Sequence, residues 1–273
     1  MKIFIDSADL DEIEKAYASG VIDGITTNPS LLKQAIVARK KARRGKVNIE
    51  DYLVELLTIA KGTPVSLEAT KTDTDGMTKE GLELYHRFNP IANNVIIKIP
   101  INTSSTGRAK NTESLKAIKT LAQERVPVNV TLVFTPEQAL IAAKAGATYV
   151  SLFAGRVDDY IREQHNIGFE KGDYWPEDGI IKDNRHIQDN GILSGAYLVK
   201  QTVLIFTRYN LKTQVLASSI RNPRQLREVA IAGAHIATVP FDVLQASLVH
   251  PKTIEGVKKF SDDVPPEYAR VAQ

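Results

Sequence analysis

The pattern of a buried strand is clearest in Asn94-Val95-Ile96-Ile97-Lys98-Ile99-Pro100, where one lysine interrupts a run of Val and Ile. Successive side chains of a strand point to opposite faces, so Lys98 faces away from both of its isoleucine neighbours. The otherwise apolar composition indicates a strand that is covered on both faces, as in a parallel sheet flanked by helices.

Similar apolar runs recur along the chain, and most are followed by a segment with helical spacing of apolar residues. The predicted strands are residues 3–5, 24–27, 64–68, 94–100, 126–131, 148–153, 214–219 and 235–240, and the predicted helices are residues 10–17, 49–60, 78–88, 115–125, 136–145, 195–209 and 223–232. Alternating strands and helices indicate parallel strands. Eight such units in 273 residues predict an α/β fold, a single (β/α)8 TIM barrel. A doubly wound open sheet is the alternative, but no Gly-x-Gly-x-x-Gly follows a strand.

Composition limits the function classes. The chain has no cysteine, which excludes disulfides, thiolate zinc sites and cysteine nucleophiles. The net charge of +3 is too small to indicate nucleic-acid binding by itself. No apolar run approaches the roughly 18 residues of a membrane span, and the N-terminal apolar stretch is too short for a signal peptide. We therefore expect a cytoplasmic protein with no membrane or nucleic-acid partner.

We expect one domain over residues 1–273, with two additions to the barrel. The first is a polar insertion at about 159–191, which carries the lone Trp175, and the second is a C-terminal helical tail at about 251–273. A basic cluster at residues 38–46 is interpreted as a solvated loop. The alternative, a patch for an anionic partner, has only this one short cluster in its favour.

Polar residues stand at the carboxyl ends of the predicted strands, where (β/α)8 barrels carry their active sites. They are Asp6, Thr27 with Asn28, Glu68, Lys98, Asn129 with Thr131, Ser151 and Ser219, while Arg156 and Arg221 follow two of the strands. Burial of Lys98 favours its neutral amine, a nucleophile that can form a Schiff base with a carbonyl. Alternatively, Lys98 extends to solvent and pairs with Glu68 or Asp6.

The remaining polar groups also have two interpretations each. Asp6 and Glu68 are candidates for general acid–base catalysis, or else a helix cap and a surface carboxylate. Asn28 either binds a ligand or starts a helix through an Asn-Pro turn. Arg156 and Arg221 match phosphate oxygens, although two surface arginines in rim ion pairs are an alternative. The five scattered histidines predict no metal site.

Six motifs in chain order resemble the transaldolase family. They are Phe4-Ile5-Asp6-Ser7-Ala8, Gly24-Ile25-Thr26-Thr27-Asn28-Pro29-Ser30, Ile97-Lys98-Ile99-Pro100, Asn129-Val130-Thr131-Leu132-Val133-Phe134, Phe153-Ala154-Gly155-Arg156-Val157-Asp158 and Ala217-Ser218-Ser219-Ile220-Arg221. The resemblance covers most of the chain and is strongest to short, single-barrel transaldolases.

This resemblance implies a class I aldolase barrel that transfers a dihydroxyacetone unit from sedoheptulose 7-phosphate or fructose 6-phosphate to an aldose phosphate. It implies roles for single residues: Lys98 forms the imine, Asp6 is the acid–base group, and Glu68 and Thr131 position a water. Substrate contacts are implied for Thr27, Asn28, Asn129, Ser151 and Phe153, and phosphate contacts for Arg156, Ser219 and Arg221. It also implies a homo-oligomer in the pentose phosphate pathway that needs no cofactor or metal.

Two alternatives remain at the level of sequence. Fructose 6-phosphate aldolases, which this chain also resembles, have the same fold and lysine. They differ from this chain at two places, with Gln at the position of Glu68 and Tyr at the position of Phe153. These two residues favour transaldolase. The second alternative, a sugar-phosphate-binding barrel without catalysis, is disfavoured because Lys98, Asp6 and Glu68 are all present.

Overall fold

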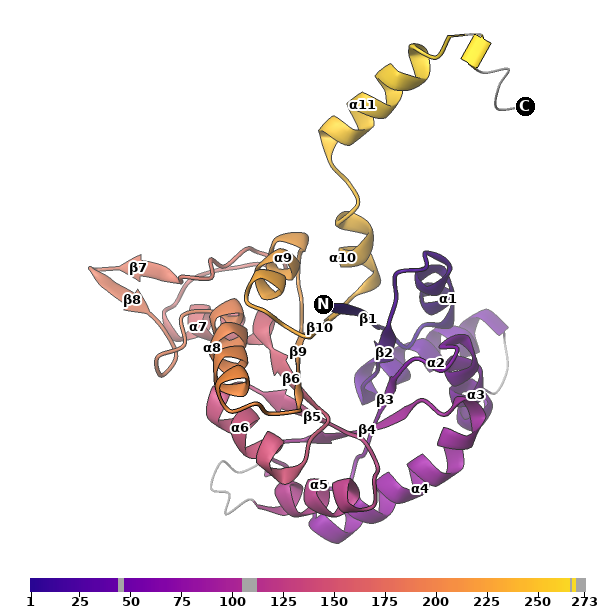
Figure 1. The fold of residues 1–273 in the computed structure, drawn as a ribbon, viewed down its shortest axis with the longest axis vertical. Coiled ribbons are helices and arrows are strands. Elements are labelled where there is room, and N and C mark those ends of the chain that lie inside the picture. The colour runs from indigo at the N-terminus through magenta and orange to yellow at the C-terminus, as the bar shows by residue number, and fades with distance from the viewer. Residues whose placement is uncertain (44–46, 105–111, 266, 269–273) are drawn as a thin grey trace.

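Within the described part of the chain, eight parallel strands close into a barrel in which β1 pairs with β2 on one side and with β10 on the other. Figure 1 shows this computed structural model, which describes residues 1–43, 47–104, 112–265 and 267–268. The closed barrel confirms the predicted fold class. The strands are β1 (Lys2–Asp6), β2 (Gly24–Thr26), β3 (Val65–Glu68), β4 (Val95–Pro100), β5 (Val128–Val133), β6 (Tyr149–Phe153), β9 (Gln214–Ser218) and β10 (Ile236–Val239).

Helices follow the strands and surround the barrel (Figure 1). They are α1 (Leu10–Ala18), α2 (Pro29–Arg43), α3 (Ile49–Ile59), α4 (Thr74–Ala92), α5 (Glu113–Gln123), α6 (Pro136–Ala145), α7 (Ala154–Gln164), α8 (Gly195–Arg208), α9 (Pro223–Ile231), α10 (Phe241–Ala246) and α11 (Pro251–Asp262). Local sequence explains several starts: Thr135 and Asn222 cap α6 and α9 with their side chains, and each is followed by a proline in the first turn.

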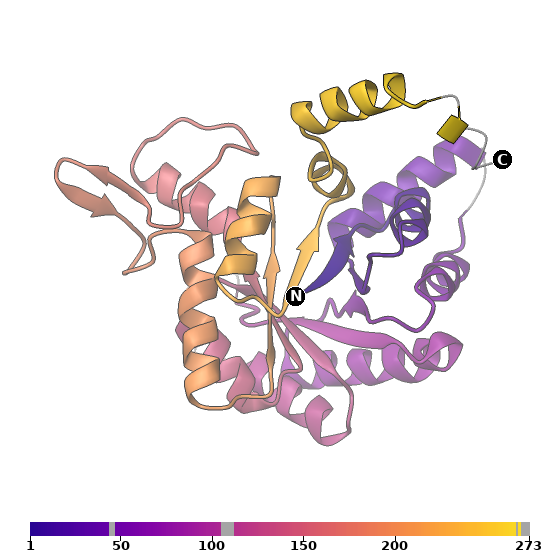
Figure 2. The ribbon, with the colours of Figure 1, turned by 45° about the horizontal axis from the view of Figure 1, so that its top comes forward.

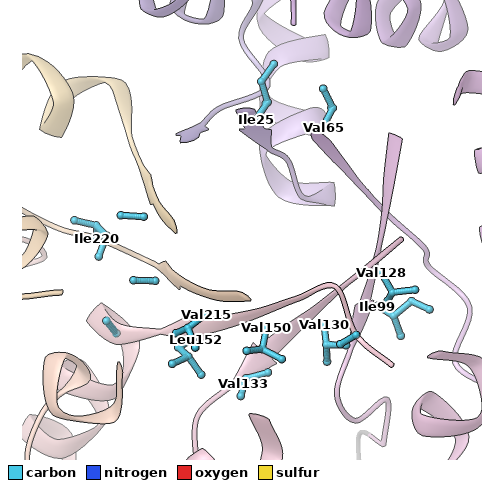
Figure 3. Packing of buried hydrophobic residues seen from close by; sticks show 14 of the residues in the cluster. Ile25, Val65, Ile99, Val128, Val130, Val133, Val150, Leu152, Val215 and Ile220 are labelled. Carbon is cyan, nitrogen blue, oxygen red and sulfur yellow. The ribbon is translucent and has the colours of Figure 1, made fainter. Parts of the chain in front are cut away.

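Apolar side chains on the outer face of the strands form the contact with the helices. Neighbouring strands contribute them at equal heights, because Val130 is in register with both Ile99 and Val150, and Val150 is in register with Val215. All four residues belong to one buried cluster, part of which is drawn in Figure 3. Burial of this belt is the main stabilising contribution that the strands make to the barrel.

A second, smaller apolar cluster fills the inside of the barrel. Its members are Phe4, Ile96, Tyr149, Leu216 and Ile236, and the rings of Phe4 and Tyr149 meet edge to face. The inward-facing positions two residues further along the same strands are polar: Asp6, Lys98, Ser151, Ser218 and Thr238. The apolar plug therefore closes the bottom of a polar layer that opens toward the carboxyl ends of the strands.

The basic segment 38–46 is not a loop as far as the structure describes it, because α2 continues through Arg43. The helix forms because Leu31, Leu32 and Ala35 pack against the core, while Lys40 and Lys41 are exposed. Arg39 pairs with Glu55 and stacks over the ring of Tyr52. The prediction of a solvated loop is thus wrong for residues 38–43, and residues 44–46 lie outside the described residues.

The predicted insertion starts later than expected. Residues 159–164 belong to α7, because Val157 and Ile161 give this helix an apolar face against the barrel. The chain then leaves the barrel and forms an antiparallel hairpin of β7 (Ile180–Lys182) and β8 (Arg185–Ile187), which projects from the molecule in both ribbon views (Figures 1 and 2). That the whole chain is one domain stays a prediction.

The predicted C-terminal tail contains α11, which has no buried residue and extends away from the barrel (Figures 1 and 2). Residues 266 and 269–273 of the tail lie outside the described residues. No helix among the described residues is both long and apolar enough to cross a membrane.

Candidate active site

A pocket of about 900 Å³ opens at the carboxyl ends of the barrel strands. It contains most of the residues predicted from the strand ends, namely Asp6, Asn28, Lys98, Thr131, Ser151, Phe153, Arg156, Ser219 and Arg221. The other predicted residues, Thr27, Glu68 and Asn129, lie behind this surface and contact residues of the polar layer. The structure therefore brings all of the predicted site residues into one region.

Lys98 lies at the centre of the polar layer and is only 5% exposed. It is in register with Glu68 on β3 and with Asn129 on β5. Its Nζ lies 3.0 Å from Glu68 Oε2 and donates a hydrogen bond of 2.9 Å to the carbonyl of Thr27. The lysine thus faces the barrel interior, as expected for a nucleophile, and is also paired with Glu68, as the alternative interpretation required. A carboxylate in direct contact gives the amine a place to deliver its proton.

Asp6, at the end of β1, supplies a second carboxylate to the pocket. Burial raises the pKa of Asp6 above its usual value, and the opposing influence of the Lys98 charge is smaller. Its Oδ1 accepts a hydrogen bond of 2.8 Å from Thr26, whose hydroxyl also meets that of Thr238 at 2.6 Å. Asp9, not Asp6, caps α1, so the capping alternative for Asp6 is wrong.

A chain of hydrogen bonds holds the amide of Asn129. Its Nδ2 donates to Ser66 Oγ at 3.1 Å, and its Oδ1 accepts from Ser151 Oγ at 2.7 Å. By contrast, Thr131 Oγ1 is buried at the pocket without a hydrogen-bond partner in the described chain. A buried hydroxyl without a partner is costly, so this group is suited to bind a ligand or a water molecule.

The two residues of the β2 loop have structural roles. Thr27 directs its hydroxyl to the carbonyl of Ser66 and offers its own carbonyl to Lys98. Asn28 accepts a hydrogen bond from the backbone N–H of Leu31 in the first turn of α2, and it also lines the pocket. The helix-starting interpretation of Asn28 is therefore correct, and its remaining amide donor is at the pocket.

The far end of the pocket carries the arginines. Arg156 follows β6, is exposed, and lies over the ring of Phe153 at 5.1 Å from the ring centroid. Arg221 pairs with Asp159 of α7 at 2.9 Å, and its backbone N–H donates to Gln225 Oε1. Ser219, between them, has a left-handed φ of 60° that directs the loop after β9 into the pocket. Two guanidinium groups and a hydroxyl at one end form an anion-binding surface.

Several site residues were missed by sequence reasoning. Thr26 and Thr238 hydrogen-bond around Asp6, and a single threonine in the apolar run Ile236-Ala237-Thr238-Val239 was a usable signal. Asp159, the ion-pair partner of Arg221, was assigned to the insertion instead of to α7. Within the described ranges no group of three or more His, Asp or Glu side chains is placed to hold a metal ion.

A protein family and several proteins of known sequence match this chain over nearly its whole length. The model of the transaldolase/fructose-6-phosphate aldolase family matches residues 3–271. A probable transaldolase of Thermoplasma acidophilum is 39% identical over 263 residues, which are 96% of this chain and 95% of that protein. A probable transaldolase of Anaeromyxobacter dehalogenans is 40% identical over the same length, with 96% of each chain covered.

Among solved structures, a mandelate oxidase variant with an FMN adduct has a TM-score of 0.50 and 14% identity, covering 88% of this chain and 64% of that one. This similarity extends to the barrel fold alone. Sequence relatives and the family model, by contrast, span nearly the whole chain, including every strand that carries a site residue. By these matches, and as its six motifs predicted, the chain belongs to the transaldolase/fructose-6-phosphate aldolase family.

Proposed function

We propose that the protein is a transaldolase, which moves a dihydroxyacetone unit from a ketose phosphate to an aldose phosphate through a Schiff base on Lys98. The observation that supports this most directly is the buried Lys98 amine, 3.0 Å from Glu68, in a pocket that also contains the Asp6 carboxylate. The donors are sedoheptulose 7-phosphate or fructose 6-phosphate, and the acceptors are the corresponding shorter aldose phosphates. Metal ions and cofactors have no part in this proposal.

Imine formation begins with transfer of a proton from Lys98 to Glu68. The free amine adds to the C2 carbonyl of the ketose and forms a carbinolamine, whose hydroxyl leaves as water after protonation. Glu68 supplies that proton, and the unpartnered hydroxyl of Thr131 holds the departing water. The same two residues position the water that hydrolyses the imine in the reverse direction.

Carbon–carbon cleavage then requires a base at the C4 hydroxyl. Asp6 takes that proton, the C3–C4 electron pair moves into the imine to form an enamine, and the aldose phosphate leaves. Transfer runs in the opposite sense when the enamine attacks the acceptor aldehyde and Asp6 returns the proton. Asn28, Asn129 and Ser151 are the proposed partners of the dihydroxyacetone hydroxyls, while Arg156, Ser219 and Arg221 bind the phosphate.

Release of free dihydroxyacetone, the aldolase reaction, is the second candidate. It differs from transaldolase in whether the enamine carbon takes a proton or attacks an acceptor aldehyde, and water hydrolyses the imine afterwards in both reactions. Glu68 and Phe153 favour transaldolase, because the resembling aldolases carry an amide and a phenol at these places. A carboxyl group next to the imine holds water differently from an amide, and this affects how long the enamine survives.

We also propose that the protein is a homo-oligomer. An isolated helix of the length of α11 is only marginally stable in water, so it needs a surface to pack against. Its exposed apolar residues Ile254, Val257 and Phe260 recur every three positions and so form one stripe. We propose a second copy of this chain as the partner. The cytoplasmic location and the absence of a nucleic-acid partner stay predictions from sequence.

Borohydride trapping tests the proposed chemistry. Incubation with fructose 6-phosphate followed by reduction is expected to add a dihydroxyacetone unit to Lys98, which mass spectrometry of the digested protein locates. The Lys98→Met variant, folded as judged by circular dichroism, serves as the control and is expected to remain unmodified. If the wild type remains unmodified too, the Schiff-base mechanism is wrong.

Product analysis separates the two candidate reactions. With sedoheptulose 7-phosphate as donor and D-glyceraldehyde 3-phosphate as acceptor, a transaldolase forms fructose 6-phosphate and erythrose 4-phosphate. Release of free dihydroxyacetone at a comparable rate in the absence of acceptor would assign the aldolase reaction instead. Binding of the sugar phosphate without turnover in either direction would indicate the non-catalytic barrel.

A further inference from the structure

A tight turn in the insertion brings a lysine to the mouth of the pocket. The backbone N–H of Asp173 donates to the carbonyl of Glu170 at 3.0 Å, and the carboxylate of Asp173 accepts from the N–H of Glu170. Lys171 and Gly172 form the centre of this turn, where Gly172 has a φ of 136° that other residues rarely adopt. Lys171 is exposed and lines the same pocket as the two arginines.

The turn is tied to the phosphate end of the barrel. Asn222, which caps α9 directly after Arg221, donates a hydrogen bond of 2.9 Å to the carbonyl of Gly172. From the other side, Arg162 of α7 donates to the carbonyl of Asp173. The chain that carries Lys171 is therefore fastened to both elements that supply the candidate phosphate-binding loops.

The anchor of the segment is a buried aromatic contact. The Arg162 guanidinium lies 5.1 Å from the ring centroid of Phe169 and 4.9 Å from that of Trp175. Trp175 is 3% exposed and donates from Nε1 to the carbonyl of Leu193. A cation against two aromatic rings, with the indole N–H satisfied, is a stable local core. The turn is consequently held in place in the absence of any ligand.

The three cations at this end differ in their charge balance. Arg221 is paired with Asp159, whereas no carboxylate pairs with Lys171 or Arg156 within the described chain. Part of the Arg221 charge is thus already compensated before a ligand arrives. The unpaired ammonium of Lys171 lines the same pocket as Arg221, whose charge Asp159 partly neutralises. It therefore adds attraction for a doubly charged phosphate group.

We propose that Lys171 is a substrate-specificity residue, a third cation by which the insertion binds the phosphate group of the sugar. This inference rests on the proposed function, since it concerns the phosphate end of the same site. It gives the inserted segment a role in recognition of phosphorylated substrates and none in the bond-breaking steps at Lys98.

The test compares one acceptor with and without its phosphate, D-glyceraldehyde 3-phosphate and D-glyceraldehyde. In the Lys171→Met variant, KM for the phosphorylated acceptor is expected to rise about three- to tenfold at low salt, with kcat nearly unchanged. KM for the unphosphorylated acceptor is expected to stay the same, and Lys171→Arg is expected to restore the wild-type value. Lys182→Met, in the hairpin of the same insertion, is the matched control and is expected to leave both values unchanged.

Gly172→Ala examines position separately from charge. The added methyl group has free space, but the backbone angle is unfavourable for alanine, so the turn shifts while Lys171 remains. We expect this variant to raise KM for the phosphorylated acceptor only. Equal KM values for Lys171→Met and the wild type, or an equal rise for both acceptors, would overturn the inference.

Failure of the inference is distinguishable from failure of the proposed function. Borohydride trapping with unphosphorylated dihydroxyacetone depends on Lys98 and not on the phosphate end of the pocket. Trapping in the wild type together with unchanged KM values in Lys171→Met rejects the role of Lys171 alone. Absence of trapping in the wild type rejects the Schiff-base chemistry itself.

Discussion

At the scale of single residues, the site depends on the different surroundings of the two carboxylates, Glu68 and Asp6, near the Lys98 amine. Glu68 contacts Lys98 directly, while Asp6 is held by Thr26 and its pKa is raised by burial. Strand alternation made Lys98, Asp6 and Glu68 predictable, because each occupies an inward-facing position near the end of an apolar strand. The sequence left Glu68 and Asp6 open as partners of Lys98, and the choice of Glu68 was not predictable, since it depends on the register between β3 and β4.

The Asp6 carboxylate sets the first prediction. Replacement Asp6→Asn is expected to lower kcat by about 10²–10⁴, the usual cost of losing general acid–base catalysis. Because burial raises the pKa of Asp6, the wild-type activity is expected to rise with pH through a step above the ordinary carboxyl range. Rates measured from pH 4 to 8 in both proteins check this, and the step is expected to be missing in the variant.

The hydroxyl of Thr26 offers a finer control for the same group. Its hydrogen bond favours the ionised form of Asp6 and so lowers the pKa of that carboxyl. In Thr26→Val the acidic step of the pH–rate profile is expected to move to higher pH, with the maximal rate reduced less than in Asp6→Asn. A step that stays in place in Thr26→Val would show that another group controls it.

A second buried carboxylate, Asp158, controls stability. Burial raises the pKa of Asp158 to about 7, although its oxygens accept hydrogen bonds from the Gly195 N–H and from Gln225 Nε2. The folded protein therefore holds a proton that the unfolded chain releases near pH 4. The contribution of Asp158 to stability is fully present below pH 4 and is lost as the pH rises through about 7.

This pH dependence is measurable against a variant that cannot ionise. Urea denaturation gives the free energy of unfolding of the wild type and of Asp158→Asn at each pH. Between pH 4 and pH 8 the wild type is expected to lose on the order of 3 kcal/mol of stability relative to the variant. Any constant loss of hydrogen bonding in the variant cancels in this comparison. A difference that does not vary with pH would contradict the raised pKa.

At the scale of elements, the barrel strands were predictable and the helices with polar sequences were not. Strands buried on both faces leave mostly apolar runs, so all eight barrel strands of the described chain appeared in the sequence. α2 and α7 were missed because both helices are rich in charged residues, such as Arg39 in α2 and Asp158 in α7, and their apolar faces are narrow. The turn that carries Lys171 was unpredictable for another reason. Its position depends on the contacts of Arg162 with the rings of Phe169 and Trp175, which no sequence pattern indicates.

At Gly155 the start of α7 lies very close to the loop after β9. A Cβ on this residue would lie 2.2 Å from the carbonyl oxygen of Ser219 and 2.7 Å from Nε of Arg221. The start of α7 and the loop after β9 can approach this closely only because residue 155 has no side chain. Gly155→Ala is therefore expected to cost about 1–3 kcal/mol of unfolding free energy and to weaken binding of phosphorylated substrates.

Gly168→Ala is the matched control, because a Cβ there meets nothing within 4 Å and its backbone angle is not left-handed. Thermal denaturation is expected to show a lower Tm for Gly155→Ala and a nearly unchanged Tm for Gly168→Ala. KM values for phosphorylated and unphosphorylated acceptors then report whether the loop with Ser219 and Arg221 has shifted. Equal Tm values for the two variants would mean that the loop moves aside without cost.

At the scale of the whole molecule, the barrel and the C-terminal tail differ in how their apolar surface is covered. The barrel has an outer belt and an inner plug, both buried, whereas Ile254, Val257 and Phe260 in the tail are more than half exposed. Sequence patterning predicted a helix in this tail, but patterning alone does not identify the surface that covers it. The fold of one chain leaves this apolar stripe without a partner among the described residues.

The last prediction concerns that stripe. Ile254→Glu combined with Phe260→Glu places two charges in it, and a charge in an apolar interface is strongly unfavourable unless it is paired. Because α11 makes no buried contact with its own barrel, the fold and the Lys98 site of each chain are expected to remain intact. Light scattering after size-exclusion chromatography is expected to give a multiple of the 30.1 kDa chain mass for the wild type and a smaller mass for the variant. A double variant with Lys252→Glu and Lys258→Glu, on the same helix outside the stripe, separates the effect of charge from that of the apolar surface. A wild type at monomer mass would refute the proposed homo-oligomer.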